Sequence, residues 1–234
     1  MTISLTQQTG RRAAWPVVLV LAALVGLVQS PSAVAAETAQ QVIDNARRTF
    51  ETLLDDPEQK ELQNVIADAK GVLIFPRVIK GGFILAGEGG TGVLLVKGQD
   101  GVWSSPAFYT LAAGSIGLQI GGQVSQVVLT VMNDGAVDAI LSNKFKVGAD
   151  ASVAIGPFGK GVEASTTSNL NLDVYAFSKT AGLFGGGALE GAAIVARDNL
   201  NQAYYGPGTT PQDIVLHRRA HNPAADPLRR SLTR

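Results

Sequence analysis

Hydrophobic positions near the start of the chain recur every three to four residues, which predicts helices. Residues 38–54 place one apolar stripe on a helix, made by Val42, Ile43, Ala46, Phe50, Leu53 and Leu54. Residues 56–59, Asp-Pro-Glu-Gln, then supply an N-cap, a proline at the first helical position and an N3 side chain that reaches back to the cap. A second helix is expected there, with inward positions at Leu62, Val65, Ile66 and Ala69. We expect Gly71 to end this helix in the left-handed conformation.

From residue 72 onward the hydrophobic period shortens to two, which predicts strands. The expected strands are 72–75, 83–86, 93–97, 115–120, 124–132, 145–153, 162–166, 170–176 and 192–197. The strand at 124–132 is expected to be buried on both faces, whereas the alternation from residue 145 onward predicts an antiparallel meander with one solvent-facing side. Asn133 is placed to cap a short helix through Leu141, and Thr210 is placed to open a short C-terminal helix.

Glycine is the outlier of the composition, because 23 of the 27 glycines fall between Gly71 and Gly191. Glycine inside a strand weakens a flat sheet, so this number indicates strong curvature, bulges or the close approach of another layer. The predicted fold class is therefore α+β. It consists of a glycine-rich, strongly curved antiparallel sheet or barrel, covered by N-terminal helices and a short C-terminal helix.

The first 35 residues have the order of a signal peptide. A polar start ends in Arg11-Arg12, an apolar run occupies residues 17–28, and residues 33–35 read Ala-Val-Ala. The apolar run of 12 residues gives a helix of about 18 Å, shorter than the roughly 30 Å of hydrocarbon in a bilayer. We therefore expect cleavage after Ala35 and an exported protein, periplasmic or secreted, through the general or the twin-arginine route. A retained membrane anchor is the alternative.

The charge and the cysteine content of the chain exclude several classes of partner and of chemical site. Lys and Arg number 19, as do Asp and Glu, so no net positive charge favours nucleic acid as a partner. The absence of cysteine excludes disulfides, thiol nucleophiles and Cys-based zinc sites, and neither a metal nor another cofactor is expected. Five arginines, two prolines and one aspartate after His217 indicate that residues 217–234 form a basic, disordered tail. The remaining domain would span residues 36–216.

Motifs of catalysis are incomplete in this chain, so an enzyme is not expected. Residues 87–92 satisfy G-x-G-x-x-G, but an apolar strand follows where nucleotide binding requires a helix, which indicates a turn between strands. Ser115 is one residue short of a hydrolase elbow, and the only two histidines lie near the C-terminal end. Turnover lost on substitution of Ser115 or Glu163 would revive the enzyme interpretation.

Basic residues beside the first predicted strand are the candidate binding site. Lys70, Arg77 and Lys80 lie close together in the sequence, next to Gly81-Gly82, and such cations with exposed amides can hold a lipid phosphate. Ordinary solvated charge is the competing interpretation. Arg47 and Arg48 on the first helix are further candidates for a membrane-facing surface, although a helix packed on its own sheet has the same stripe.

Five separate blocks of the sequence resemble the SYLF lipid-binding domain family, which is also described as an actin-binding domain family in yeast. They are AKGVLIFP at 69–76, KGGF at 80–83, WSSPAFY at 103–109, SIGLQIG at 115–121 and GLF at 182–184, within a match over most of residues 38–216. The resemblance implies a non-catalytic module that binds phospholipid, with actin association in fungal members. The implied lipid contacts are basic residues, here Lys70, Arg77 and Lys80, followed by Arg47 and Arg48.

The sequence thus predicts a non-catalytic module of the bacterial cell envelope that binds anionic phospholipid. A structural or protein-interaction scaffold of the envelope, without a lipid ligand, is the alternative. Because an export signal is predicted, cytoskeletal actin is not an expected partner. The identity of the lipid and the oligomeric state stay open at this stage.

Overall fold

In the computed structural model the chain divides into residues 1–36 and residues 37–234. The structure describes residues 37–82, 85–116, 121–142, 145–147, 149–150, 152–155, 173–182 and 191–233. The predicted signal peptide, residues 1–35, lies outside the described residues. So do the predicted turn at 156–159 and the predicted strand at 162–166.

The predicted first helix is α2 (Ala39–Leu54), and all six positions of its apolar stripe are buried. Thr38 caps it in a reciprocal box with Gln41. The predicted second helix is divided into a 3₁₀ turn, η2 (Pro57–Gln59), capped by Asp56, and a helix, α3 (Glu61–Asp68). The prediction for Gly71 is wrong, because the chain already leaves the helix at Ala69 and Gly71 pairs with Val96 and Val131 in the sheet.

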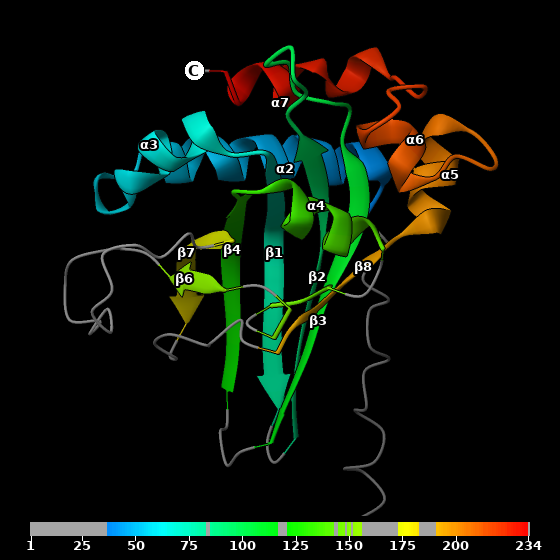
Figure 1. Cartoon of the computed structure of the whole chain (residues 1–234). Helices are drawn as coiled ribbons and strands as arrows, with labels where there is room; N and C mark the ends of the chain where they lie inside the picture. The colour runs from blue at the N-terminus through cyan, green and yellow to red at the C-terminus, as the bar shows by residue number, and fades with distance from the viewer. Residues whose placement is uncertain are drawn as a thin grey trace, which may run out of the picture. The chain divides into compact units, whose positions relative to one another are not determined.

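In the described part of the chain, eight strands form one strongly curled sheet in the order β5-β8-β3-β2-β1-β4-β7-β6 (Figure 1). They are β1 (Gly71–Gly82), β2 (Leu85–Val96), β3 (Ala107–Ile116), β4 (Gly121–Val131), β5 (Phe145–Lys146), β6 (Val153–Ile155), β7 (Val174–Gly182) and β8 (Ala193–Ala196). All neighbouring pairs are antiparallel except β6 and β7, which are parallel. The predicted α+β class with a strongly curved sheet is confirmed.

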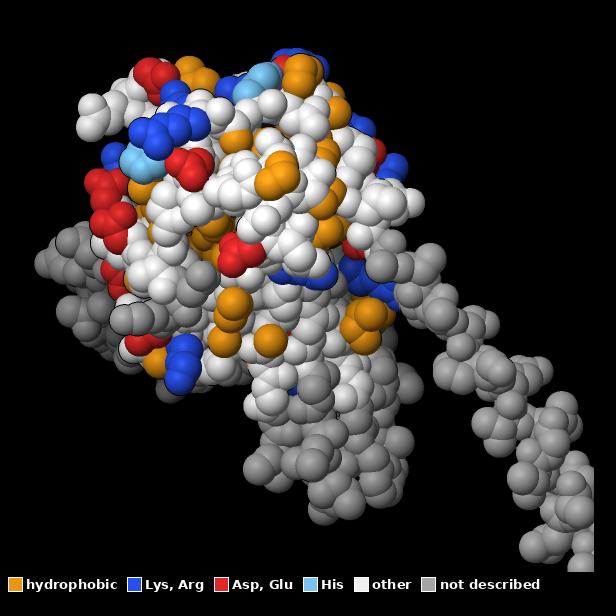
Figure 2. Space-filling view, turned by 90° about the vertical axis from the view of Figure 1, so that its right-hand side faces the viewer, with side chains coloured by type: hydrophobic (Ala, Val, Ile, Leu, Met, Phe, Trp, Pro, Cys, Tyr) orange, Lys and Arg blue, Asp and Glu red, His pale blue; other side chains and the backbone are white. Residues whose placement is uncertain are grey.

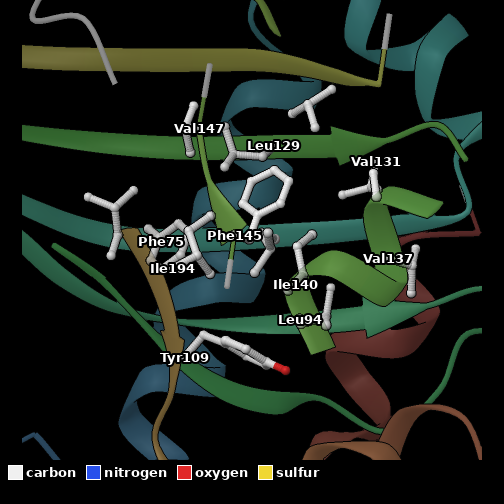
Figure 3. Close-up of a cluster of buried hydrophobic side chains, with 14 of the residues drawn as sticks. Phe75, Leu94, Tyr109, Leu129, Val131, Val137, Ile140, Phe145, Val147 and Ile194 are labelled. Atoms are coloured by element: carbon white, nitrogen blue, oxygen red, sulfur yellow. The ribbon is translucent and has the colours of Figure 1, made fainter. Parts of the chain in front are cut away.

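Both faces of the sheet are covered in its central part. On one face, here called the α4 face, Leu73 and Phe75 pack with α4 (Asp134–Leu141) and β5 (Figure 3). On the opposite face, here called the α2 face, Val72 and Ile74 pack with α2. The prediction of a solvent-facing side is therefore wrong for β7, because Tyr175 packs against the α2-face core while Val174 and Ala176 are buried on the α4 face.

The predicted strand at 145–153 is broken into two short strands at opposite edges of the sheet. β5 pairs with β8, whereas β6 pairs with β7. The chain turns between them because the Asp150 carboxylate accepts a hydrogen bond from the Lys146 N–H, at 2.7 Å, and the Asp150 N–H donates back to the Lys146 carbonyl. Local side-chain bonds to the backbone thus outweigh the alternating pattern.

The prediction of a disordered C-terminal tail is also wrong. After α5 (Asp198–Tyr205) and the predicted short helix α6 (Pro211–Val215), the chain forms η3 (Pro223–Ala225) and α7 (Asp226–Ser231), which packs on α2. The tail is anchored by apolar side chains at helical spacing, with Leu228 and Leu232 buried. Its arginines also find partners in the domain, since Arg218 forms an ion pair with Asp100 at 2.7 Å.

Candidate functional site

The three basic residues predicted to form one cluster do not lie together. Lys70 is exposed directly before β1, and Arg77 follows seven residues later within that strand. Lys80 lies on the α4 face, because it is two residues from Val78 of that core. A strand rises about 3.3 Å per residue, so Lys70 and Lys80 are roughly 30 Å apart along β1. Their proximity in sequence therefore does not create a common phosphate site.

The two arginines of α2 differ in their surroundings. Arg47 forms an ion pair with Glu51 one turn later, with 3.0 Å between Nη1 and Oε2, so its charge is largely compensated within the helix. Arg48 is exposed and does not belong to the buried stripe. Arg48 lines a hollow of the described surface, and Arg47 is not among the residues that line this hollow.

This hollow, the basic groove, lies between α2 and the sheet and has a volume of about 640 Å³. Its lining residues come from α2, β1, β4 and β7. They are Asn45, Arg48, Thr49, Thr52, Pro76, Arg77, Val124, Gln126, Lys179, Thr180 and Ala181. The structure thus joins one arginine from each of the two predicted groups, Arg48 and Arg77, and adds Lys179.

A bulge in β1 explains the place of Arg77. The register of β1 against β4 shifts between Phe75 and Val78, where Pro76 has no N–H to donate to the sheet. Two glycines of β2 accommodate the bulge: a Cβ on Gly90 would lie 2.3 Å from the Arg77 carbonyl oxygen, and a Cβ on Gly92 would lie 2.3 Å from that of Ile74. The predicted turn at 87–92 is therefore wrong, since these glycines are required for close strand approach within β2.

The groove has the chemistry of an anion site. Arg48, Arg77 and Lys179 supply cations, and no described residue that lines the groove is acidic. Arg77 forms no ion pair or side-chain hydrogen bond with another described residue. Lys179 is held by Asp56 at 2.9 Å, and its hydrogen bond is the main reason why the pKa of Asp56 is lowered. Guanidinium groups suit phosphate oxygens because they donate two parallel hydrogen bonds.

An apolar pair borders the groove on the same face. Ile79 and Val124 are direct cross-strand partners on β1 and β4, and they are 47% and 39% exposed. Val124 also lines the groove. Exposed aliphatic side chains beside cations are typical of surfaces that lie against membrane headgroups. The face on the side of α5 and α6 instead carries charges of both signs among scattered hydrophobic residues (Figure 2).

Lys179 is the groove residue that the sequence analysis missed. It lies in β7, three residues beyond the predicted strand at 170–176, and Gln126 of β4 is its direct partner. The amide of Gln126 donates to Thr49 Oγ1 of α2 at 3.2 Å, which connects the sheet with the helix across the groove. No local signal in the sequence relates Lys179 to Arg48, because 131 residues separate them.

Catalytic arrangements find little support among the described residues. Ser105 Oγ lies 3.4 Å from His221 Nδ1, and His221 Nε2 lies 3.8 Å from Asp226. These distances exceed the 2.6–3.2 Å or so at which a base activates a nucleophile, and Ser105 is only 6% exposed. Glu163 and the side chain of Ser115 lie outside the described residues. In the part of the chain that the structure describes, no three His, Asp or Glu side chains gather as metal ligands, and no helix is long and apolar enough to span a bilayer.

Comparison with known proteins finds one family over the C-terminal half. The family model described as "Ysc84: Las17-binding protein actin regulator" matches residues 112–234. Protein YSC84 of Saccharomyces cerevisiae (strain ATCC 204508 / S288c) is 34% identical over 171 residues, which cover 72% of this chain and 36% of the yeast protein. LAS seventeen-binding protein 3 of the same strain is 33% identical over 172 residues, or 72% of this chain and 37% of that protein.

A human relative matches this chain with similar identity and over a similar length. SH3 domain-containing YSC84-like protein 1 of Homo sapiens is 33% identical over 166 residues, which cover 70% of this chain and 48% of the human protein. The chain therefore spans between about a third and about half of the length of these relatives. Their names, like the description of the family model, refer to binding, domains and regulation rather than to catalysis.

Proposed function

The chain belongs to the Ysc84 family, and we propose that it serves there as a non-catalytic module that binds anionic phospholipid at a membrane surface. The resemblance of its sequence blocks to the SYLF family agrees with this membership. The observation that carries the proposal is the basic groove, where Arg48, Arg77 and Lys179 converge from three elements and no described lining residue is acidic.

In the proposed complex the lipid phosphate lies between the guanidinium groups of Arg48 and Arg77. Lys179 moves between Asp56 and the phosphate, as a flexible ammonium group does when two anions compete for it. Ile79 and Val124 enter the boundary between headgroups and acyl chains, so that apolar burial adds to the charge attraction. Lys70 and Lys80 have no part in this site, and Arg47 contributes little because Glu51 compensates it.

The second candidate function is a structural or protein-interaction scaffold without a lipid ligand. It is favoured by the family description, which names Las17 as a bound protein. A scaffold of this kind predicts a partner that is retained at high salt and no lipid in native mass spectra of the protein.

We also propose that the protein is exported to the bacterial periplasm or secreted after removal of residues 1–35, in which case cytoskeletal actin is not its partner. The order of polar, apolar and small residues in this segment supports the proposal. N-terminal sequencing of the exported protein tests it. A start at Ala36 is expected, and a start at Met1 would instead mean a retained anchor.

Vesicle flotation tests the lipid proposal. The chain from Ala36 is mixed with vesicles of phosphatidylcholine alone or with phosphatidylglycerol added. Recovery with the anionic vesicles that falls as salt is raised is the expected result, since exposed charge attraction is screened. Equal recovery with both vesicles, or none with either, contradicts anionic lipid binding and favours the scaffold.

A further inference from the structure

A row of polar side chains crosses the α4 face of the sheet, beyond the apolar core. Lys80 on β1 is the direct cross-strand partner of Glu88 on β2 and of Gln123 on β4. Directly opposed residues of antiparallel strands project from the same face. Because Val78 belongs to the α4-face core and Lys80 follows two residues later, all three side chains of this polar row lie on that face.

Gln123 is the best-buried member of the polar row, with 5% exposure. Its Nε2 donates to Ser125 Oγ at 2.9 Å and, more weakly, to Thr180 Oγ1 at 3.5 Å. Its Oε1 is buried and has no hydrogen-bond partner among the described residues. An unpaired buried acceptor is costly, so in a native protein such an atom calls for a partner, such as a water, an ion or a bound molecule.

The charges of the polar row cancel. Lys80 and Glu88 are opposed across β1 and β2, and burial raises the pKa of Glu88 while Lys80 lowers it. An added net charge would therefore be buried without compensation, which disfavours a charged ligand. The row offers donors at Lys80 and acceptors at Glu88 and Gln123, which suits a group that both donates and accepts hydrogen bonds.

We propose that the polar row binds a neutral, hydroxyl-rich ligand of the polyol or sugar class, one hydroxyl of which donates to Gln123 Oε1. Gln123 and the groove residue Gln126 lie on opposite faces of β4, so the two sites have different centres. Thr180, which bonds to Gln123 and Ser125, also lines the basic groove. Ser125 extends the site, because it lies two residues after Gln123 and therefore on the same face of β4. Its hydroxyl lies 3.1 Å from Thr180 Oγ1. This inference stands independently of the proposed lipid function.

The test uses glycerol and D-glucose as probes at roughly 10 mM, where binding of millimolar affinity is detectable by saturation-transfer NMR. The variant is Gln123→Leu, and the matched control is Gln202→Leu, at an exposed glutamine of α5. We expect the probe signal to fall at least roughly tenfold in the variant, since a polar site loses its orienting amide. The control should keep the signal of the unaltered protein.

Thermal unfolding without probe separates a binding role from a structural one. Gln123→Leu removes the unpaired oxygen, and Ser125 and Thr180 can still bond to each other. The melting temperature should therefore stay the same or rise by a few degrees. A lower melting temperature or failure to fold would show that the amide stabilises the domain, and would overturn the proposal. Absence of probe binding to the unaltered protein, or an unchanged signal in Gln123→Leu, would overturn it as well.

Discussion

Replacing Arg48 and Arg77 together by glutamine should weaken binding to anionic vesicles while leaving the fold intact. Both side chains are exposed, and the bulge that carries Arg77 is shaped by Pro76 and by the glycines opposite it. Surface substitutions away from such features change the free energy of unfolding by about 0.5 kcal/mol or less. The melting temperature of the double variant should therefore stay close to that of the original protein.

The size of the effect follows from the charge of the groove. A cation near an anionic membrane contributes about 1 kcal/mol, and a partly desolvated contact to a charged group contributes about 1.5–3 kcal/mol. Removing two such groups should cost at least about 2 kcal/mol of binding free energy. Since about 1.4 kcal/mol is a factor of ten, affinity should fall roughly 30-fold or more.

Lys70→Gln is the matched control in a vesicle co-sedimentation titration with phosphatidylglycerol vesicles. Lys70 directly precedes β1 and lies seven residues before Arg77, which is roughly 20 Å along the strand direction. That separation is about twice the Debye length at 0.1 M salt, so the charge of Lys70 should be screened from the groove. Affinity of the control should change by less than about threefold.

Two results would refute this reasoning. If Lys70→Gln weakens binding as much as the double variant does, the protein responds to bulk charge and the groove has no special role. If the double variant binds as before, the membrane contact lies elsewhere on the molecule. Raising salt should also weaken the original protein more than the double variant, because fewer ionic contacts remain to be screened.

Three further predictions concern stability. Gly92→Ala should lower the melting temperature by several degrees, since overpacking costs about 1–3 kcal/mol and each kcal/mol shifts a domain of this size by about 2–4 °C. Gly81→Ala should leave the melting temperature unchanged, because no atom lies within 4 Å of the added Cβ. Equal effects of the two substitutions would contradict the close approach of β1 to Gly92. Leu228→Ala should cost about 2–5 kcal/mol in chemical denaturation, because the side chain is fully buried, whereas a disordered tail would show no change. Hydrogen bonds from Ser152 are the main reason why the pKa of Asp173 is lowered, so the carboxylate stabilises the fold fully above the ordinary pKa of 3.8 and loses this effect as the pH falls through the lower folded pKa. Asp173→Asn should therefore be less stable than the original protein at neutral pH, and the difference in stability should vanish in acid. A difference that does not depend on pH would refute this prediction.

The sequence by itself determined the elements whose causes are local. The apolar stripe of α2, the Asn133 cap of α4 and the Thr210 cap of α6 act within a few residues, so the pattern and the caps predict these helices correctly. The sequence blocks likewise indicated the family. The abundance of glycine correctly predicted curvature and a bulge, because a strand interior without Cβ atoms has few other uses.

Tertiary structure decided the features that depend on partners far apart in the chain. Residues 87–92 have the sequence of a turn, but they continue a strand. Their glycines are needed there because the bulge of β1 leaves no space for a Cβ at Gly90 or Gly92. The arginine-rich sequence at the C-terminal end is typical of a disordered segment. The ion pair of Arg218 with Asp100 and the buried face of α7 instead hold it on the domain. Long-range pairing of this kind leaves no periodic signal in the sequence.

The candidate site shows the same division. Arg77 and Lys80 are close in sequence, but they lie on opposite faces of the sheet because side chains alternate along the strand after the bulge. Lys70 lies far from both, because each residue of a strand adds about 3.3 Å. Arg48 and Lys179 are 131 residues apart, and the packing of α2 on β4 and β7 brings them to one groove. The sequence supplied the cations, and the path of the chain through the sheet decided which of them meet.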